Sequence, residues 1–104
     1  MKVRKPINNE SLKDAIFIAR ISDALSHPVR VSILAYVRAK NKIRNDICNK
    51  DLVNHFDYSQ SSLSQHVKKL RDVDLFTVEY KNKFSFYSVN VDQLDKFRTL
   101  ISHL

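Results

Sequence analysis

The most regular spacing of apolar residues in the chain lies between residues 59 and 72. Leu63, Val67 and Leu70 recur there every three or four positions, which is the period of a helix with one buried face. Ser59 precedes them as a suitable N-cap. At about 100° per residue, the opposite face of this polar helix is expected to centre on Ser61, Ser64, Gln65 and Lys68. Short hydroxyls, an amide and an ammonium group on one exposed face can contact base edges and phosphates, although an ordinary solvated helix has the same composition.

Two runs after the polar helix have the apolar–polar alternation of half-buried strands. They extend from Leu75 to Tyr80 and from Phe84 to Val89. Residues 81–83 join them, and Asn82 suits the positive φ that a tight hairpin turn needs. The sequence therefore predicts a β-hairpin with a lysine on either side of Asn82 at its tip. Those lysines either reach a neighbouring phosphate or the minor groove, or only keep the hairpin soluble.

Two further helices are expected before the polar helix. Pro28 at a first helical position starts one that ends near Ala39. A shorter one runs from Asn49 to Phe56 and is followed by a tight turn, with Leu52, Val53 and Phe56 pointing inward. Helix, turn, helix and hairpin in this order are the plan of a winged helix-turn-helix. We therefore predict a mainly α fold with a β-hairpin, in the order α-α-α-α-β-β-α.

A first helix is expected over residues 11–25 and a last helix over residues 92–104. Ser11 and Asp14 have the spacing of a capping box, and Asp92 is the expected N-cap of the last helix. The first helix has apolar residues on more than one face, and no later segment covers the apolar stripe of the last helix. We therefore expect the two helices to form the seam of a symmetric dimer. The expected interface residues are Leu12, Ile16, Phe17, Leu94, Phe97, Leu100, Ile101 and Leu104.

Composition limits the classes of protein to consider. The chain has 104 residues, so residues 1–104 are expected to form a single domain. One cysteine excludes an intrachain disulfide, and no apolar run approaches the ~20 residues that span a bilayer. The basic N-terminal segment lacks the apolar core of a signal peptide. We therefore expect a cytoplasmic protein without a membrane partner.

The formal net charge of +7 favours a polyanionic partner. A cluster of basic residues falls in the polar helix and the hairpin, which is where a winged helix touches a phosphate backbone. We therefore expect double-stranded DNA as the partner. The candidate DNA-binding residues are Gln60, Ser61, Ser62, Ser64, Gln65, His66, Lys68, Lys69, Arg71, Lys81, Asn82 and Lys83.

Several of these motifs resemble the ArsR/SmtB family of repressors. Residues 24–34, with their Pro-x-Arg element at Pro28 and Arg30, are similar to the opening of that family, and Ser64-Gln65-His66 matches the Ser-x-His element of its core. The likeness covers residues 21–89. It implies a homodimeric winged-helix repressor that places the polar helix in the major groove. It also implies that many members release DNA when a metal or another inducer binds.

The metal-binding motifs of that family are not matched. Where its arsenic and cadmium sensors carry Cys-Val-Cys, this chain has Cys48-Asn49-Lys50, and one thiol beside an ammonium group is a poor site for a soft metal. The last helix lacks the paired ligands of the zinc sensors, and the histidines at 27, 55 and 66 have no ligand spacing. We therefore expect no metal or other cofactor, and no inducer is assigned. Asp74 and Asn82 stand where the family has glycines in turns.

The sequence predicts a sequence-specific DNA-binding transcriptional regulator, a repressor that acts as a homodimer on a palindromic operator. Two alternatives stay open. One is a winged-helix module that binds another protein and not DNA. The other is a regulator switched through Cys48, whose thiol lies near a helix start and near Lys50. An enzyme is not expected, because the sequence has no Gly-rich phosphate loop, no metal cluster and no nucleophile–base pair.

Overall fold

The computed structural model describes residues 9–104, with side chains from residue 11 onward. The basic N-terminal segment, which is not expected to be a signal peptide, lies outside the described residues. Five helices and one antiparallel pair of strands follow each other in the predicted order, so the predicted fold class is confirmed. The elements are α1 (Asn9–Ala24), α2 (Pro28–Asn41), α3 (Asn49–His55), α4 (Gln60–Asp72), β1 (Phe76–Lys81), β2 (Phe84–Val89) and α5 (Val91–Ser102).

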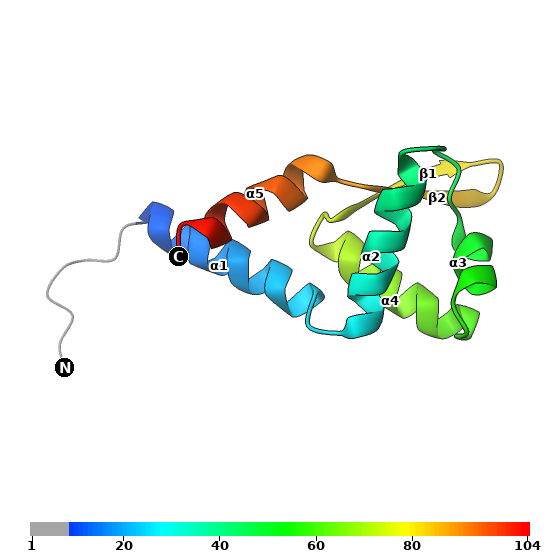
Figure 1. The fold of residues 1–104 in the computed structure, drawn as a ribbon, viewed down its shortest axis with the longest axis horizontal. Coiled ribbons are helices and arrows are strands. Elements are labelled where there is room, and N and C mark those ends of the chain that lie inside the picture. The colour runs from blue at the N-terminus through cyan, green and yellow to red at the C-terminus, as the bar shows by residue number, and fades with distance from the viewer. Residues whose placement is uncertain (1–8) are drawn as a thin grey trace, which may run out of the picture.

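The elements separate into two ends of the molecule (Figure 1). At one end α2, α3 and α4 pack together with the β1–β2 hairpin, which we call the wing. At the other end α1 and α5 lie side by side, although they are the first and last elements of the chain. Among the described residues, no helix is both long and apolar enough to cross a membrane.

The hydrophobic core lies where α2, α3, α4 and β1 meet. Ile33 of α2, Leu52 of α3, Leu63 of α4 and Phe76 of β1 are all buried. Burying each such side chain stabilises the fold by about 1.5–3 kcal/mol. The prediction for Val53 was wrong: it is 38% exposed, because the short α3 turns only one narrow face to the core.

Both terminal helices begin earlier than expected. Ser11 lies inside α1 and is not its cap, since the helix already includes Asn9. The N-cap of α5 is Asn90, whose side chain accepts a hydrogen bond from the Gln93 amide at 3.2 Å, and Asp92 lies in the first turn. Asn90 takes the cap position because its own amide donates to the Leu75 carbonyl at 2.8 Å, which fixes the chain as it leaves the wing.

A second hydrogen bond of Leu75, made by its amide, explains a shift in the start of the first strand. The sequence predicts that the strand begins at Leu75, but Leu75 lies outside it. The Leu75 amide donates to the Leu70 carbonyl at 3.0 Å, which closes the end of α4. The strand therefore begins at Phe76 and ends at Lys81. Tyr80, expected to be half-buried, is 78% exposed because it lies near the tip of the wing, beyond the core.

Turns that glycine commonly makes are made here by other residues, since the chain has no glycine. Asp74, the second residue after α4, has φ 60°. Asn82, at the tip of the wing, has φ 52°. Both residues tolerate this left-handed conformation, as expected where the family has glycines. Lys83 also has a positive φ, of 67°, so both central residues of the wing turn are left-handed.

Candidate nucleic-acid interface

Helix α4 has the two faces that its sequence predicts. The Ser59 hydroxyl accepts a hydrogen bond from the Ser62 amide at 3.2 Å and caps the helix. Leu63, Val67 and Leu70 are buried. On the opposite side, the predicted outward residues are all exposed; they are Ser61, Ser64, Gln65 and Lys68. A continuous polar face is therefore available to a partner.

The cations of α4 differ in their surroundings. Lys68 Nζ lies 2.7 Å from Asp72 Oδ2, one helical turn away. The hydrogen bond from Lys68 lowers the pKa of the Asp72 carboxyl, so this pair stays charged and largely offsets itself. Lys69 and Arg71 are exposed and form no ion pair with any acid that the structure describes. The uncompensated charge of the helix thus lies on its flank and last turn.

His66 is half-buried, as expected, and its partners are two side chains from the start of α2. Its ring centroid lies 4.6 Å from that of His27, and its Nδ1 lies 3.4 Å from Nη1 of Arg30. Arg30 also donates from Nε to the Ala24 carbonyl at 2.6 Å. Burial, followed by the charges of His27 and Arg30, lowers the pKa of His66. The spacing of the sequence gave no sign of this contact, which joins two motifs far apart in the chain.

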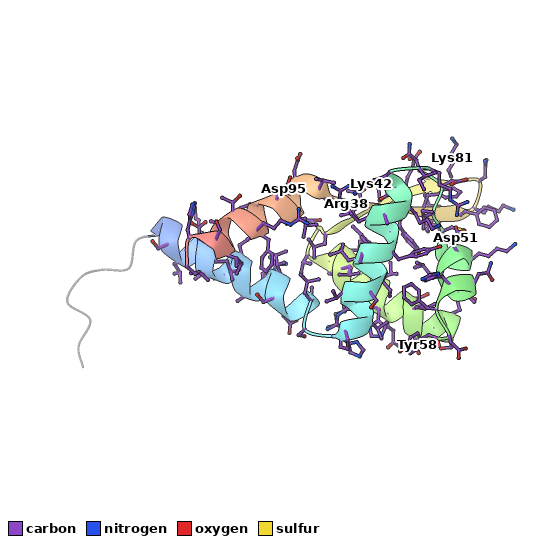
Figure 2. All side chains as sticks on the ribbon, viewed as in Figure 1. Arg38, Lys42, Asp51, Tyr58, Lys81 and Asp95 are labelled. Atoms are coloured by element: carbon purple, nitrogen blue, oxygen red, sulfur yellow. The ribbon has the colours of Figure 1, made fainter. Side chains whose placement is uncertain are left out.

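The wing presents its tip to solvent. Lys81, Asn82 and Lys83 are all exposed, and Phe84 beside them is 57% exposed. Lys81 points away from the body of the protein (Figure 2). No described acid forms an ion pair with either lysine. The tip therefore carries two free cations.

A cleft with a volume of about 510 Å³ lies between α3, α4 and the wing. Lys50 and Val53 line it from α3, Gln60 and Ser64 from α4, and Lys83 and Phe84 from the wing. No acidic side chain is among the described residues that line it. Lys50 was missing from the residues predicted to bind DNA, because its position beside the wing depends on contacts between distant parts of the chain.

The start of α3 is held by a carboxylate. Asp51 accepts hydrogen bonds from the Cys48 amide at 2.9 Å and from Arg44 Nη2 at 2.6 Å. Partial burial alone raises the pKa of Asp51, but the Cys48 amide and Arg44 outweigh it, and the net shift is downward. The Cys48 thiol also donates to Asp51, at 3.4 Å, so a thiolate there would face a carboxylate. Within the described part of the chain, no three His, Cys, Asp or Glu side chains gather as metal ligands do.

The apolar residues of the terminal helices divide into two groups. Phe17, Leu94 and Phe97 are buried or half-buried where α1 and α5 pack on each other. Leu12, Ile16 and Ile101 are 46%, 51% and 39% exposed. Leu100 is half-buried, and Leu104 lies beyond the end of α5, 86% exposed. The two helices thus bury part of their apolar surface against each other. Leu12, Ile16 and Ile101 remain exposed to solvent, and we call them the apolar strip.

The sequence of this chain is similar to those of bacterial regulatory proteins. Residues 27–77 match the model of a family described as "Bacterial regulatory protein, arsR family". The chain is 33% identical over 78 residues to the arsenical resistance operon repressor of Staphylococcus xylosus, over 75% of this chain and 70% of that protein. It is 30% identical over 71 residues to the transcriptional repressor SdpR of Bacillus subtilis, over 68% of this chain and 73% of SdpR.

Solved structures with a similar fold agree with these matches. NolR from Sinorhizobium fredii superposes with a TM-score of 0.70 at 27% identity, over 95% of this chain and 94% of that one. An ArsR-like transcriptional regulator from Rhodococcus sp. RHA1 has a TM-score of 0.73 at 17% identity, over 86% and 79% of the two chains.

Proposed function

Since the chain belongs to the ArsR family of bacterial regulatory proteins, which are DNA-binding transcriptional regulators and not enzymes, we propose that it represses transcription as a homodimer on a palindromic operator. The domain as a whole acts as one winged helix-turn-helix, with α4 in the major groove. Repression is carried over from relatives that are named repressors. The arsenical response in the name of one relative is not carried over, because Cys48 here donates to Asp51 and has Lys50 in place of a second thiol.

The observation that carries the proposal is the exposed polar face of α4 beside a basic wing. Ser61, Ser64 and Gln65 have hydroxyl and amide groups suited to base edges, and the Gln amide pairs best with adenine. The phosphate contacts come from the cations around them, which are Lys68, Lys69, Arg71, Lys81 and Lys83. Of these, Lys68 contributes least, because Asp72 already pairs with it.

The dimer follows from the open apolar strip on α1 and α5. Leu12, Ile16 and Ile101 are exposed at the end of the molecule opposite the wing, where a second copy covers them without blocking α4. A two-fold axis at this seam presents two α4 helices to one face of the DNA. Successive major grooves on that face are about 34 Å apart, so the operator has two half-sites related by symmetry.

The proposal is tested by selecting genomic DNA fragments that the protein retains and sequencing them. We expect an enriched, imperfectly palindromic sequence. Gln65→Ala should relax the preference at one base pair in each half-site, with a loss of about 1–3 kcal/mol in discrimination. Lys83→Ala should instead weaken binding to every sequence and reduce the slope of log K against log salt by about 0.9 for each protomer bound.

Arg98→Ala is the matched control, because it removes the same charge from α5 at the other end of the molecule. It should leave both the base preference and the salt slope unchanged. A protein that retains no fragment at all contradicts the proposal and favours the alternative of a winged-helix module that binds another protein.

A further inference from the structure

A pocket separate from the polar face of α4 lies where α1, α5 and the chain segment after α4 meet. Its volume is about 220 Å³, and an apolar cavity of about 150 Å³ already holds one benzene ring. Apolar and polar side chains line it together: Ile16, Phe17, Ile21 and Val73, with Lys13, Arg20, Asp74 and Gln93. The pocket therefore has the size and the mixed lining of a site for a small organic molecule.

The walls of the pocket are fixed by contacts between these three segments. Ile21 of α1 is fully buried, and Phe17, one turn before it, packs against the core. The Lys96 ammonium group of α5 lies 4.2 Å from the centroid of the Phe17 ring, which is a cation–π contact. Gln93 Nε2 donates to the Val73 carbonyl at 3.0 Å and so joins α5 to the end of α4. The apolar surface of the pocket is thus preformed, and a ligand does not have to order it.

The rim of the pocket carries unpaired charges of both signs. The Arg20 guanidinium forms no ion pair with any acid that the structure describes, and no described cation pairs with Asp74. Both side chains line the pocket, yet they do not pair with each other. The backbone holds Asp74 in place, since its amide donates to the Arg71 carbonyl at 2.9 Å. A ligand with a single charge would leave either the guanidinium or the carboxylate without a partner, whereas a zwitterion matches both.

We propose that this pocket binds a small zwitterion with an apolar body, of which an α-amino acid with an apolar side chain is the simplest kind. The ligand carboxylate pairs with Arg20, whose planar fork suits a bidentate contact, and the ligand ammonium group pairs with Asp74. The apolar side chain of the ligand lies against Phe17, Ile21 and Val73.

The position of the pocket links such a ligand to DNA binding. Val73 and Asp74 follow α4, which carries the polar face, and Ile16 belongs to the apolar strip of the proposed dimer seam. A ligand in contact with both places favours one position of α4 relative to α1. Binding to the operator and binding of the ligand then change each other by the same factor. This regulatory role rests on the proposed function, whereas the binding of the ligand does not.

The first test titrates the full chain, without DNA, with L-leucine and then with L-phenylalanine, and follows amide chemical shifts. We expect saturable shifts around the pocket at millimolar ligand or below. Hydrocinnamate lacks the ammonium group of phenylalanine and phenethylamine lacks its carboxylate, so each should bind at least about tenfold more weakly. Glycine, which has both charges but no apolar body, should not bind measurably.

Variants of the protein test the same contacts from the other side. Arg20→Gln and Asp74→Asn should each weaken the binding of L-phenylalanine by about tenfold or more. Asparagine keeps the left-handed backbone that residue 74 needs, so the turn after α4 stays intact. Arg98→Gln removes a charge from α5 outside the pocket and should bind the ligand as the unchanged protein does.

The possible failures are distinguishable. The absence of saturable shifts with both amino acids overturns the inference. Equal binding of glycine or of either analogue, or unchanged binding by a folded Arg20→Gln variant, overturns the assigned contacts. For the regulatory role, saturating L-phenylalanine should change the affinity for a selected operator duplex at least about fivefold, and an unchanged affinity overturns that role. If the protein without ligand binds no duplex, the proposed function itself fails, while the titration without DNA still decides the ligand site.

Discussion

At the scale of single residues, His66 ties the helix that carries the polar face to the rest of the molecule. Its Nδ1 is 3.4 Å from Arg30, whose Nε and Nη2 donate to the carbonyls of Ala24 and Asp23 at 2.6 and 3.3 Å. A guanidinium group only donates, so the facing nitrogen of His66 must be unprotonated to accept. His27, whose ring lies beside that of His66 at a tilt of 47°, uses its own Nδ1 to accept from the Val29 amide at 3.1 Å. The contact between α4 and α2 therefore depends on a neutral His66 ring.

This contact predicts a loss of stability in mild acid. Burial, and then His27 and Arg30, hold the pKa of His66 below its ordinary value of 6.5 in the folded protein. The unfolded chain therefore takes up the proton first as the pH falls. The contribution is fully present above about pH 6.5 and is lost as the pH falls through the lower folded pKa. In His66→Gln, which can accept from Arg30 but does not titrate, melting temperature should fall less between pH 7 and pH 5.

His103→Gln serves as the control, because His103 is exposed at the end of α5, far from Arg30. It should keep the acid sensitivity of the unchanged protein. An equally steep decline of melting temperature in His66→Gln would show that His66 is not the titrating group.

At the scale of elements, the turn of the wing places the Lys83 ammonium group at the cost of a strained backbone conformation. Asn82 and Lys83 both have positive φ, which is the requirement of the type I′ turn whose twist matches the paired strands. Asparagine tolerates this conformation, but for lysine it costs about 1 kcal/mol. Lys83 thereby lies at the edge of the cleft shared with α3 and α4.

Lys83→Gly should therefore stabilise the domain while weakening its binding to DNA. Relief of the left-handed conformation is worth up to about 1 kcal/mol, less the entropy that glycine adds to the unfolded chain. Unfolding in urea and salt-dependent DNA binding measure the two effects on the same variant. Lys81→Gly, which removes the same charge from a strand position, should lower stability by about 0.5–1 kcal/mol. Equal destabilisation by both variants would rule out strain at Lys83.

At the scale of the whole molecule, two ends have different chemistry. One end joins the polar face of α4 to the basic wing, and the other end exposes apolar residues of α1 and α5. A second copy that covers the apolar strip leaves the polar end free, so dimerisation and DNA binding are compatible. In the proposed homodimer the two would also be coupled, because two joined domains bind two half-sites with an avidity that a monomer lacks.

Ile16→Glu should thus give a monomer that binds the operator at least about 100-fold more weakly, since the gain from linked sites is lost. Sedimentation equilibrium reports the mass, and titration of the duplex reports the affinity. Ile43→Glu introduces the same charge at a residue that is 80% exposed in the loop after α2, and should stay dimeric. A dimeric Ile16→Glu variant would place the seam elsewhere.

The sequence by itself determined the features that depend on neighbours within about one helical turn. The order of elements, the buried face of α4 at Leu63, Val67 and Leu70, the Ser59 cap and the left-handed Asn82 all follow from local period and turn chemistry. Such features depend on residues that are close together in the sequence, so the residue pattern encodes them directly.

Only the tertiary structure decided which distant segments meet. Asn90 caps α5 because Leu75 accepts its amide, and Lys50 reaches the wing because Ile47 accepts the amide of Tyr87. The pairing of His66 with Arg30 is of the same kind. Each contact joins residues whose separation along the chain has no periodic signature, and its geometry is set by how the helices pack around the core. The polar face of the candidate interface was thus readable from sequence, whereas its cleft and its tie to α2 required the fold.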